Sequence, residues 1–193
     1  SGDVDGIRNV AVGFHAGQSQ NDADDNVWVG YQCGLTNTTG TGNTGIGKDA
    51  LRANTTAGLN TAVGSDALTL NTTGSQNTVV GALAMDANTT GSNCTAVGMS
   101  ALGQNTTGSH NTAFGHNSMA INTTGTQNVA LGMQTLFHNN ASNNVAVGHY
   151  ALESNTSGFD NTGVGKSALD NNTTGNYNSA VGKDSLKANT TGQ

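Results

Sequence analysis

The sequence predicts an all-β fold, a β-solenoid of about eleven stacked coils. A seventeen-residue unit, clearest from Asn60 to Gln76, recurs along the chain. Each copy has apolar residues at fixed places, with Gly, Asn and Thr between them. These turn residues leave no more than about six residues for a regular segment, which is too short for a stable helix. A single copy cannot bury its apolar residues, but a stack of copies can.

Within each copy, the positions are numbered from 1, which is usually Asn, to 17. Nine of the ten intervals between copies are seventeen residues and one, from Asn128 to Asn144, is sixteen. We expect the turn at residues 139–142 to absorb the missing residue. We assign residues 1–8 to a lead-in and residues 9–193 to a single solenoid domain. The copies begin at Asn9, Asn26, Asn43, Asn60, Asn77, Cys94, Asn111, Asn128, Asn144, Asn161 and Asn178.

Positions 3 and 4 predict a short strand in every copy. Position 4 is apolar and mostly β-branched, as Val63 illustrates, which favours a strand with this side chain in the core. Position 3 is small in most copies, as at Ala62, and points to the opposite face, which we expect to approach a neighbour closely. Trp28 and Val79 are exceptions at this small position.

Position 5 is glycine in all eleven copies. We expect a backbone bend there with positive φ, or an approach too close for a Cβ atom. These structural glycines are Gly13, Gly30, Gly47, Gly64, Gly81, Gly98, Gly115, Gly132, Gly148, Gly165 and Gly182.

The second half of each copy predicts another short strand and a turn. Position 8 is small and position 9 is large and apolar, as in Ala67-Leu68. The Asn-Thr-Thr-Gly segment that follows, as at residues 71–74, is typical of a turn. The position-1 Asn residues should form a ladder of hydrogen bonds from coil to coil, which Cys94 interrupts.

Composition excludes several partners. The formal net charge is −6, and only six Lys and Arg residues are scattered along the chain, so nucleic acid is not expected to bind. No apolar run approaches the roughly 18 residues of a membrane-spanning helix. The chain starts at Ser1 and finishes at the end of a copy without a capping segment. We therefore expect a processed product or fragment of a longer fibre, or head-to-tail stacking.

No catalytic, cofactor or metal site is expected. His116 and His149 share position 6 but lie two coils apart, roughly 10 Å, which is too far for joint zinc ligation. No Ser-His-Asp set can be recognised. The five histidines are His15, His110, His116, His138 and His149, and we expect them at the surface.

Acidic residues cluster at Asp3 and Asp5 and again within residues 22–25. Oxygen-rich loops can bind calcium, but neither cluster matches an established calcium loop, so solvated turns are expected. Cys33 and Cys94 lie four coils apart, roughly 19 Å, so no disulfide joins them. Repeated Asn-x-Thr sequons are explained by the chemistry of the turn without glycosylation.

Sugar binding needs aromatic side chains beside polar groups, and the candidates are Trp28, Tyr31, Tyr150, Phe159 and Tyr177. We select Trp28 and Tyr31, both in the second copy, as the possible ligand contacts. Trp28 occupies a normally small position, so it either caps the closely packed face or lies exposed.

The unit Asn-Thr-Ala-Val-Gly-x-x-Ala-Leu resembles the head repeats of YadA-type trimeric autotransporter adhesins. Its Asn-Thr-Thr-Gly segment is similar to repeats in tail-fibre and adhesin-like surface proteins of bacteria and their phages. The resemblance covers residues 9–193, although the period is longer than that of the adhesin head. It implies a left-handed parallel β-roll, a homotrimer, and a place outside the cell, at the cell surface or on a virion tail fibre. It implies no catalytic residue.

These observations predict a structural protein rather than an enzyme. The first hypothesis is a shaft or head segment of a surface adhesin or phage tail fibre that mediates host or surface attachment. Its partners would be copies of itself, in a homotrimer or a head-to-tail filament, and a cell-surface glycan or protein receptor. The alternative is a self-assembling extracellular filament without a receptor. A third hypothesis, ice binding, rests on the threonine ladders, but Thr72 and Thr73 would face opposite ways in an extended chain.

Overall fold

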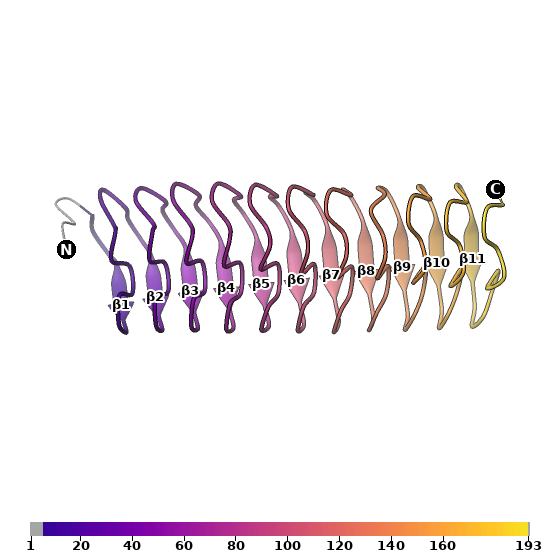
Figure 1. The fold of residues 1–193 in the computed structure, drawn as a ribbon, viewed down its shortest axis with the longest axis horizontal. Helices are drawn as coiled ribbons and strands as arrows, with labels where there is room; N and C mark the ends of the chain where they lie inside the picture. The colour runs from indigo at the N-terminus through magenta and orange to yellow at the C-terminus, as the bar shows by residue number, and fades with distance from the viewer. Residues whose placement is uncertain (1–5, 193) are drawn as a thin grey trace.

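The fold is a rod of stacked coils with one three-residue strand in each copy of the repeat. The computed structural model describes residues 6–192 (Figure 1). The strands are β1 Val10–Val12, β2 Val27–Val29, β3 Thr44–Ile46, β4 Thr61–Val63, β5 Thr78–Val80, β6 Thr95–Val97, β7 Thr112–Phe114, β8 Val129–Leu131, β9 Val145–Val147, β10 Thr162–Val164 and β11 Ser179–Val181.

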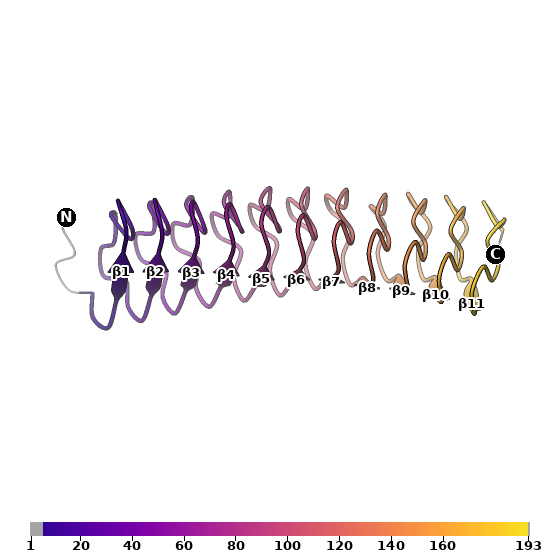
Figure 2. The same cartoon turned by 90° about the horizontal axis from the view of Figure 1, so that it is seen from below.

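All eleven strands lie in a single sheet and follow one another in sequence order. Every pair is parallel and in register, so equal positions of the repeat face each other, as Thr61 faces Thr78. Figures 1 and 2 show the coils stacked along one axis, with the two ends of the chain at opposite ends of the rod. The predicted β-solenoid is confirmed.

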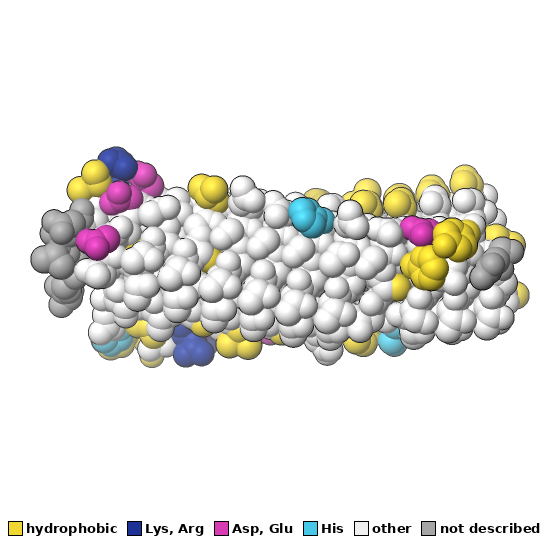
Figure 3. All heavy atoms as spheres, turned by 90° about the horizontal axis from the view of Figure 1, so that it is seen from above, with side chains coloured by type: hydrophobic (Ala, Val, Ile, Leu, Met, Phe, Trp, Pro, Cys, Tyr) yellow, Lys and Arg dark blue, Asp and Glu magenta, His cyan; other side chains and the backbone are white. Residues whose placement is uncertain are grey.

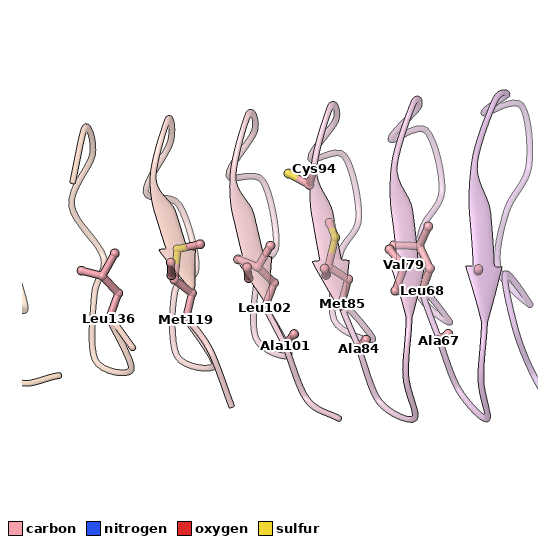
Figure 4. Packing of buried hydrophobic residues seen from close by; sticks show 14 of the residues in the cluster. Ala67, Leu68, Val79, Ala84, Met85, Cys94, Ala101, Leu102, Met119 and Leu136 are labelled. Atoms are coloured by element: carbon pink, nitrogen blue, oxygen red, sulfur yellow. The ribbon is translucent and has the colours of Figure 1, made fainter. Parts of the chain in front are cut away.

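The core lies between the strand and the turn that follows it. Position 3 is buried in β2 to β10, and in coils 3 to 10 the position-9 side chains form a row beside it, one from each of these coils (Figure 4). The core is closely packed, and in most coils a large residue at position 9 is combined with Ala or Gly at position 3, while coil 5 combines Met85 with Val79. The row consists of Leu51, Leu68, Met85, Leu102, Met119, Leu136, Leu152 and Leu169, all fully buried.

The prediction that position 4 belongs to the core is wrong. Because side chains alternate along a strand, burying position 3 turns positions 2 and 4 outward. Val80 and Phe114 are exposed, and Val63 is only partly buried. The β-branched residues at position 4 therefore favour the strand conformation without filling the interior.

The predicted second strand is absent from the described coils. Asp66 at position 7 has φ of 59° and Leu68 at position 9 has φ of 55°, in the left-handed region rather than the extended one. The segment still bonds to its neighbour, since the Leu68 backbone N–H donates to the Ala84 carbonyl at 3.0 Å. It is a turn whose hydrogen bonds run from coil to coil.

The position-5 glycines meet both conditions predicted for them. Gly64 has φ of +142°, and a Cβ atom there would lie 2.5 Å from the carbonyl oxygen of Gly81. A side chain would therefore be strained by the backbone and would collide with the next coil.

Two ladders of buried Asn side chains run along the rod. At position 1, Asn60 Oδ1 accepts from the Asn77 backbone N–H at 3.0 Å, and Asn60 Nδ2 donates to the Gly74 carbonyl at 2.9 Å. At position 12, Asn71 Nδ2 donates to both Asn54 Oδ1 and the Gly74 carbonyl, each at 2.9 Å. The predicted position-1 ladder is confirmed, and the turn Asn forms a second one.

The sixteen-residue copy keeps its register because one side chain replaces the missing backbone carbonyl. In a regular coil, the Thr72 and Thr73 backbone N–H groups both donate to the Thr89 carbonyl. In the coil before the shortened one, the equivalent groups of Thr123 and Thr124 donate to Oδ1 of Asn140 in the shortened coil, at 3.1 and 2.9 Å. The deletion lies in the predicted turn.

The described part of the predicted lead-in already follows the repeat. Arg8 has the positive φ of position 17, and the Ile7 backbone N–H donates to Asp24 Oδ1 at 2.7 Å. Residues 1–5, with the acidic pair Asp3 and Asp5, lie outside the described residues.

Candidate functional surfaces

The repeat gives the rod three lengthwise surfaces. We call them the strand face, which exposes positions 2 and 4; the charged edge, positions 6–11; and the Asn-Thr side, positions 12–17. Seen from above, the molecule presents a surface that is mostly neither charged nor hydrophobic (Figure 3). Among the described residues, charges on the Asn-Thr side are confined to residues 8–25 and Asp160.

The strand face is uncharged from end to end. No copy has Asp, Glu, Lys or Arg at positions 1–5. Position 2 is Thr, Val or Ser, and position 4 is apolar in every coil. Phe114 illustrates the consequence, since 56% of its surface is exposed. The position-4 row is Val12, Val29, Ile46, Val63, Val80, Val97, Phe114, Leu131, Val147, Val164 and Val181.

The charged edge has ion pairs in two groups. In coils 3 and 4, Lys48 Nζ lies 2.9 Å from Asp49 Oδ2 and 4.0 Å from Asp66 Oδ1. The Asp49 hydrogen bond is the main reason that the pKa of Lys48 is raised. In coils 10 and 11, Lys187 Nζ lies 3.5 Å from Asp170 Oδ2. These pairs are exposed at their lysine ends, so they contribute little to stability.

Two grooves lie on the charged edge. One, of about 380 Å³, crosses coils 5 to 8 beside Asp86 and Phe137. The other, of about 400 Å³, crosses coils 8 to 11 and is lined by Glu153, Asp170 and Lys187 among others. The second groove carries both signs of charge on its own walls. Variable residues of the repeat lie on this edge, as at Ser65-Asp66, and also on the Asn-Thr side, as at Ser75-Gln76.

Tyr31 lies at the surface, where a ligand could reach it. It is at position 6, is 46% exposed and stacks on Phe14, with 5.6 Å between ring centroids and 11° between planes. Because the rings stack along the rod, Phe14 covers one face of Tyr31. The groups that Tyr31 can offer to a ligand are the hydroxyl and the part of the ring that Phe14 does not cover.

Trp28 is fully buried, so its side chain is not at the surface for a ligand to contact. It fills space that leucines occupy elsewhere, because position 9 is glycine in the first two copies. A Cβ atom on Gly17 would lie 2.6 Å from Trp28 Cδ1, and Gly34 is equally close to the indole. The pairing of one large residue with two glycines was visible in the sequence and indicates a core residue.

The other candidates remain structural. The described residues contain no group of three or more His, Cys, Asp or Glu that could hold a metal ion. In the acidic turn, Asp25 Oδ2 accepts from Arg8 Nη2 at 2.9 Å, and this hydrogen bond holds the pKa of Asp25 below its ordinary value. Cys33 and Cys94 are free and buried. Burial raises the pKa of Cys33 to about 11, so this thiol stays protonated and unreactive near neutral pH.

Comparison with known proteins gives no family assignment. No protein-family model matches the sequence, and no match was found among curated proteins or among solved structures. The described residues contain no helix long and apolar enough to cross a bilayer.

Proposed function

We propose that this chain is a rigid segment of an extracellular fibre, the shaft or head of a surface adhesin or phage tail fibre, and that it mediates attachment to a host or surface. The observation that carries the proposal is the uncharged strand face with its unbroken apolar row at position 4. A contiguous exposed apolar stripe indicates an interaction surface. Ten coil intervals make this stripe about 48 Å long.

The partner for this face is a second and a third copy of the chain. Charge is absent from the strand face in every coil, and large charged-residue clusters lie on other surfaces. Three copies that associate side by side around a three-fold axis would each turn the strand face toward that axis, as in a closed cyclic oligomer. A bundle of this kind would be stiff and would repeat its outward surfaces, which strengthens attachment through multiple weak contacts.

Sedimentation velocity with light scattering tests the association. We expect the wild-type chain at three times its 19.3 kDa mass. The double variant Val80→Lys/Phe114→Lys should be monomeric with an unchanged circular dichroism spectrum. The matched control Met99→Lys adds charge at exposed position 6, off the strand face, and should stay trimeric. A wild-type monomer would rule out the trimer, and species of variable length would favour the filament.

Attachment is tested by binding of the immobilised chain to cells and to a glycan array. Tyr31→Ala should lower the signal if the aromatic pair at position 6 forms the contact. Tyr177→Ala is the control, because Tyr177 is exposed on a different surface. Equal binding signals from the wild-type chain, Tyr31→Ala and Tyr177→Ala would exclude Tyr31 as a contact residue. Trp28→Ala is unsuitable here, because that substitution disturbs the core.

Ice binding is a second candidate, supported by the strand face rather than by the Asn-Thr-Thr turns. In β3 to β7, position 2 is Thr throughout, beside the apolar position-4 row. Rows separated by two residues of a strand lie about 6.6 Å apart, and neighbours along a row about 4.8 Å. This is a regular array of hydroxyl and methyl groups. Absence of thermal hysteresis in solutions of the wild-type chain would exclude this candidate.

A further inference from the structure

The groove across coils 5 to 8 arises from an irregularity at position 10. In four successive coils this position is Asp86, Gly103, Ala120 and Phe137. Gly103 has no side chain and Ala120 has only a methyl group, so the row is hollow between a carboxylate and an aromatic ring. Its walls come from positions 7 and 11 of these coils, with Leu83, Ser100 and Asn117 on one side and Ala87, Gln104 and Ile121 on the other.

The Asp86 carboxylate lies beside this hollow. A Cβ atom built on Gly103 would lie 3.6 Å from Asp86 Oδ1. Any side chain larger than that of glycine or alanine at the position would therefore occupy the space beside the carboxylate. Thr69 holds this place one coil before Asp86, and it does not line the groove.

Asp86 has no cationic partner. The sequence contains no Lys or Arg between Arg52 and Lys166, and no ion pair to Asp86 occurs within residues 6–192. Burial raises the pKa of Asp86, and the charge of Asp66 raises it further, while backbone N–H groups act against this. A partly dehydrated carboxylate without a counter-charge attracts a cation.

The rest of the groove is suited to an apolar body. Leu83, Ile121 and Phe137 provide large apolar surface, and Gln104 and Asn117 are uncharged. The volume falls within the range of pockets that hold small organic ligands. From Asp86 to Phe137 there are three coil steps, or about 14 Å.

We propose that this groove binds a small organic cation, with a primary ammonium group at Asp86 and an apolar chain or aromatic ring extending toward Phe137. The site lies on the charged edge, away from the strand face, so it does not depend on the proposed association or attachment. Charge complementarity selects the cation, and the apolar walls select a ligand with an apolar body.

Isothermal titration calorimetry with 4-phenylbutylamine tests the site, with 4-phenylbutan-1-ol as the neutral analogue of the same skeleton. The wild-type chain should bind the amine about ten- to a hundredfold more tightly than the alcohol, as expected for loss of a charged hydrogen bond. Shifts of backbone amide resonances should be confined to coils 5 to 8. No binding of the amine, or equal binding of the alcohol, overturns the proposal.

Two variants locate the site. Asp86→Asn should weaken amine binding about ten- to a hundredfold without changing the fold. Gly103→Thr should abolish it by filling the hollow, and should fold because Thr69 and Ala120 show that position 10 accepts a Cβ atom. Asp160→Asn, an exposed carboxylate on the Asn-Thr side, is the matched control and should bind as the wild type does. Unchanged affinity in Asp86→Asn overturns the proposal even if the amine binds.

Discussion

At the scale of single residues, the backbone conformation of each coil depends on a few special positions. Four positions in a regular coil, 5, 7, 9 and 17, have positive φ, and only position 5 is glycine throughout. Leu68 at position 9 adopts this conformation although it is unfavourable for a side chain of its kind. Burial of the leucine in the core offsets that cost, and no such gain exists for a side chain at position 5.

Gly115→Val should destabilise the fold several times more than Ser65→Val. The first substitution strains a φ of +136° and places Cβ 2.5 Å from the Gly132 carbonyl oxygen. The second adds an exposed methyl-rich side chain at position 6, which holds residues from Ala82 to Tyr31 in other coils. Urea unfolding of both variants measures the difference. Similar midpoints would show that position 5 has no special conformational requirement.

At the scale of an element, the core of the first two coils is packed with different residues from the core of the other coils. Trp28 supplies the core volume that Leu supplies elsewhere, and Gly17 and Gly34 make room for the indole. The indole Nε1 has no hydrogen-bond partner in the structure. In the second coil, large and small residues have exchanged places between positions 3 and 9, and the indole also takes the space beside Gly17 of the first coil.

Trp28→Ala and Gly34→Leu should each destabilise the protein and should compensate when combined. Trp28→Ala leaves a cavity and is expected to cost about 3–5 kcal/mol. Gly34→Leu alone collides with the indole, whereas Leu51 shows that position 9 accepts leucine at a similar positive φ. Thermal unfolding of the two single variants and the double variant forms a double-mutant cycle. Additive losses would show that the two sites are not in steric competition.

At the scale of the whole molecule, stability is propagated through continuous ladders. Each coil bonds to the next through its backbone, through two Asn rows, and through the position-9 core. Neighbouring coils therefore stabilise each other, as in other repeat proteins, and a local defect weakens the interface on both of its sides. Cys94 is such a defect, because its thiol is a weak donor to the Gly108 carbonyl, at 3.5 Å, and has no side-chain oxygen to accept from the next coil.

Cys94→Asn should stabilise the rod by about 1 kcal/mol. The new Nδ2 group would donate to the Gly108 carbonyl, and the new Oδ1 would accept from the Asn111 backbone N–H, as in the equivalent coils. Differential scanning calorimetry should record a higher unfolding temperature. Cys33→Ala serves as the control, since it removes the other thiol at a position where Ala is usual and lies outside the Asn ladders. A lower unfolding temperature for Cys94→Asn would argue against the ladder as a source of stability.

The fold could be predicted from the sequence because the same residue types recur at fixed positions of the repeat. The constant Gly at position 5 and the Asn at position 1 predicted the bend and the ladder, and both are present. The orientation of the strand was not accessible, because small Ala62 and large Val63 are both compatible with a core. The second strand was wrongly predicted, since Ala67-Leu68 is apolar as a strand would be but left-handed at Leu68.

For the candidate sites, the sequence indicated Tyr31 and Trp28 as possible contacts. The structure shows that Tyr31 is exposed and Trp28 is buried. Trp28 lies in the core because Gly17 and Gly34 leave room for its indole. The hollow could be predicted from the sequence, because the small residues Gly103 and Ala120 lie between Asp86 and Phe137 at position 10. Which side chains border that hollow depends on the turn geometry.

The sequence by itself determined the period, the stacking and the lengthwise rows, because a repeat that cannot bury its own apolar residues must stack in register. The tertiary structure decided which rows face inward. That choice depends on packing inside the coil, where the small residue that most coils have at position 3 leaves space for the large side chain at position 9. The alternation of side chains along the strand then turns the valines of position 4 toward solvent.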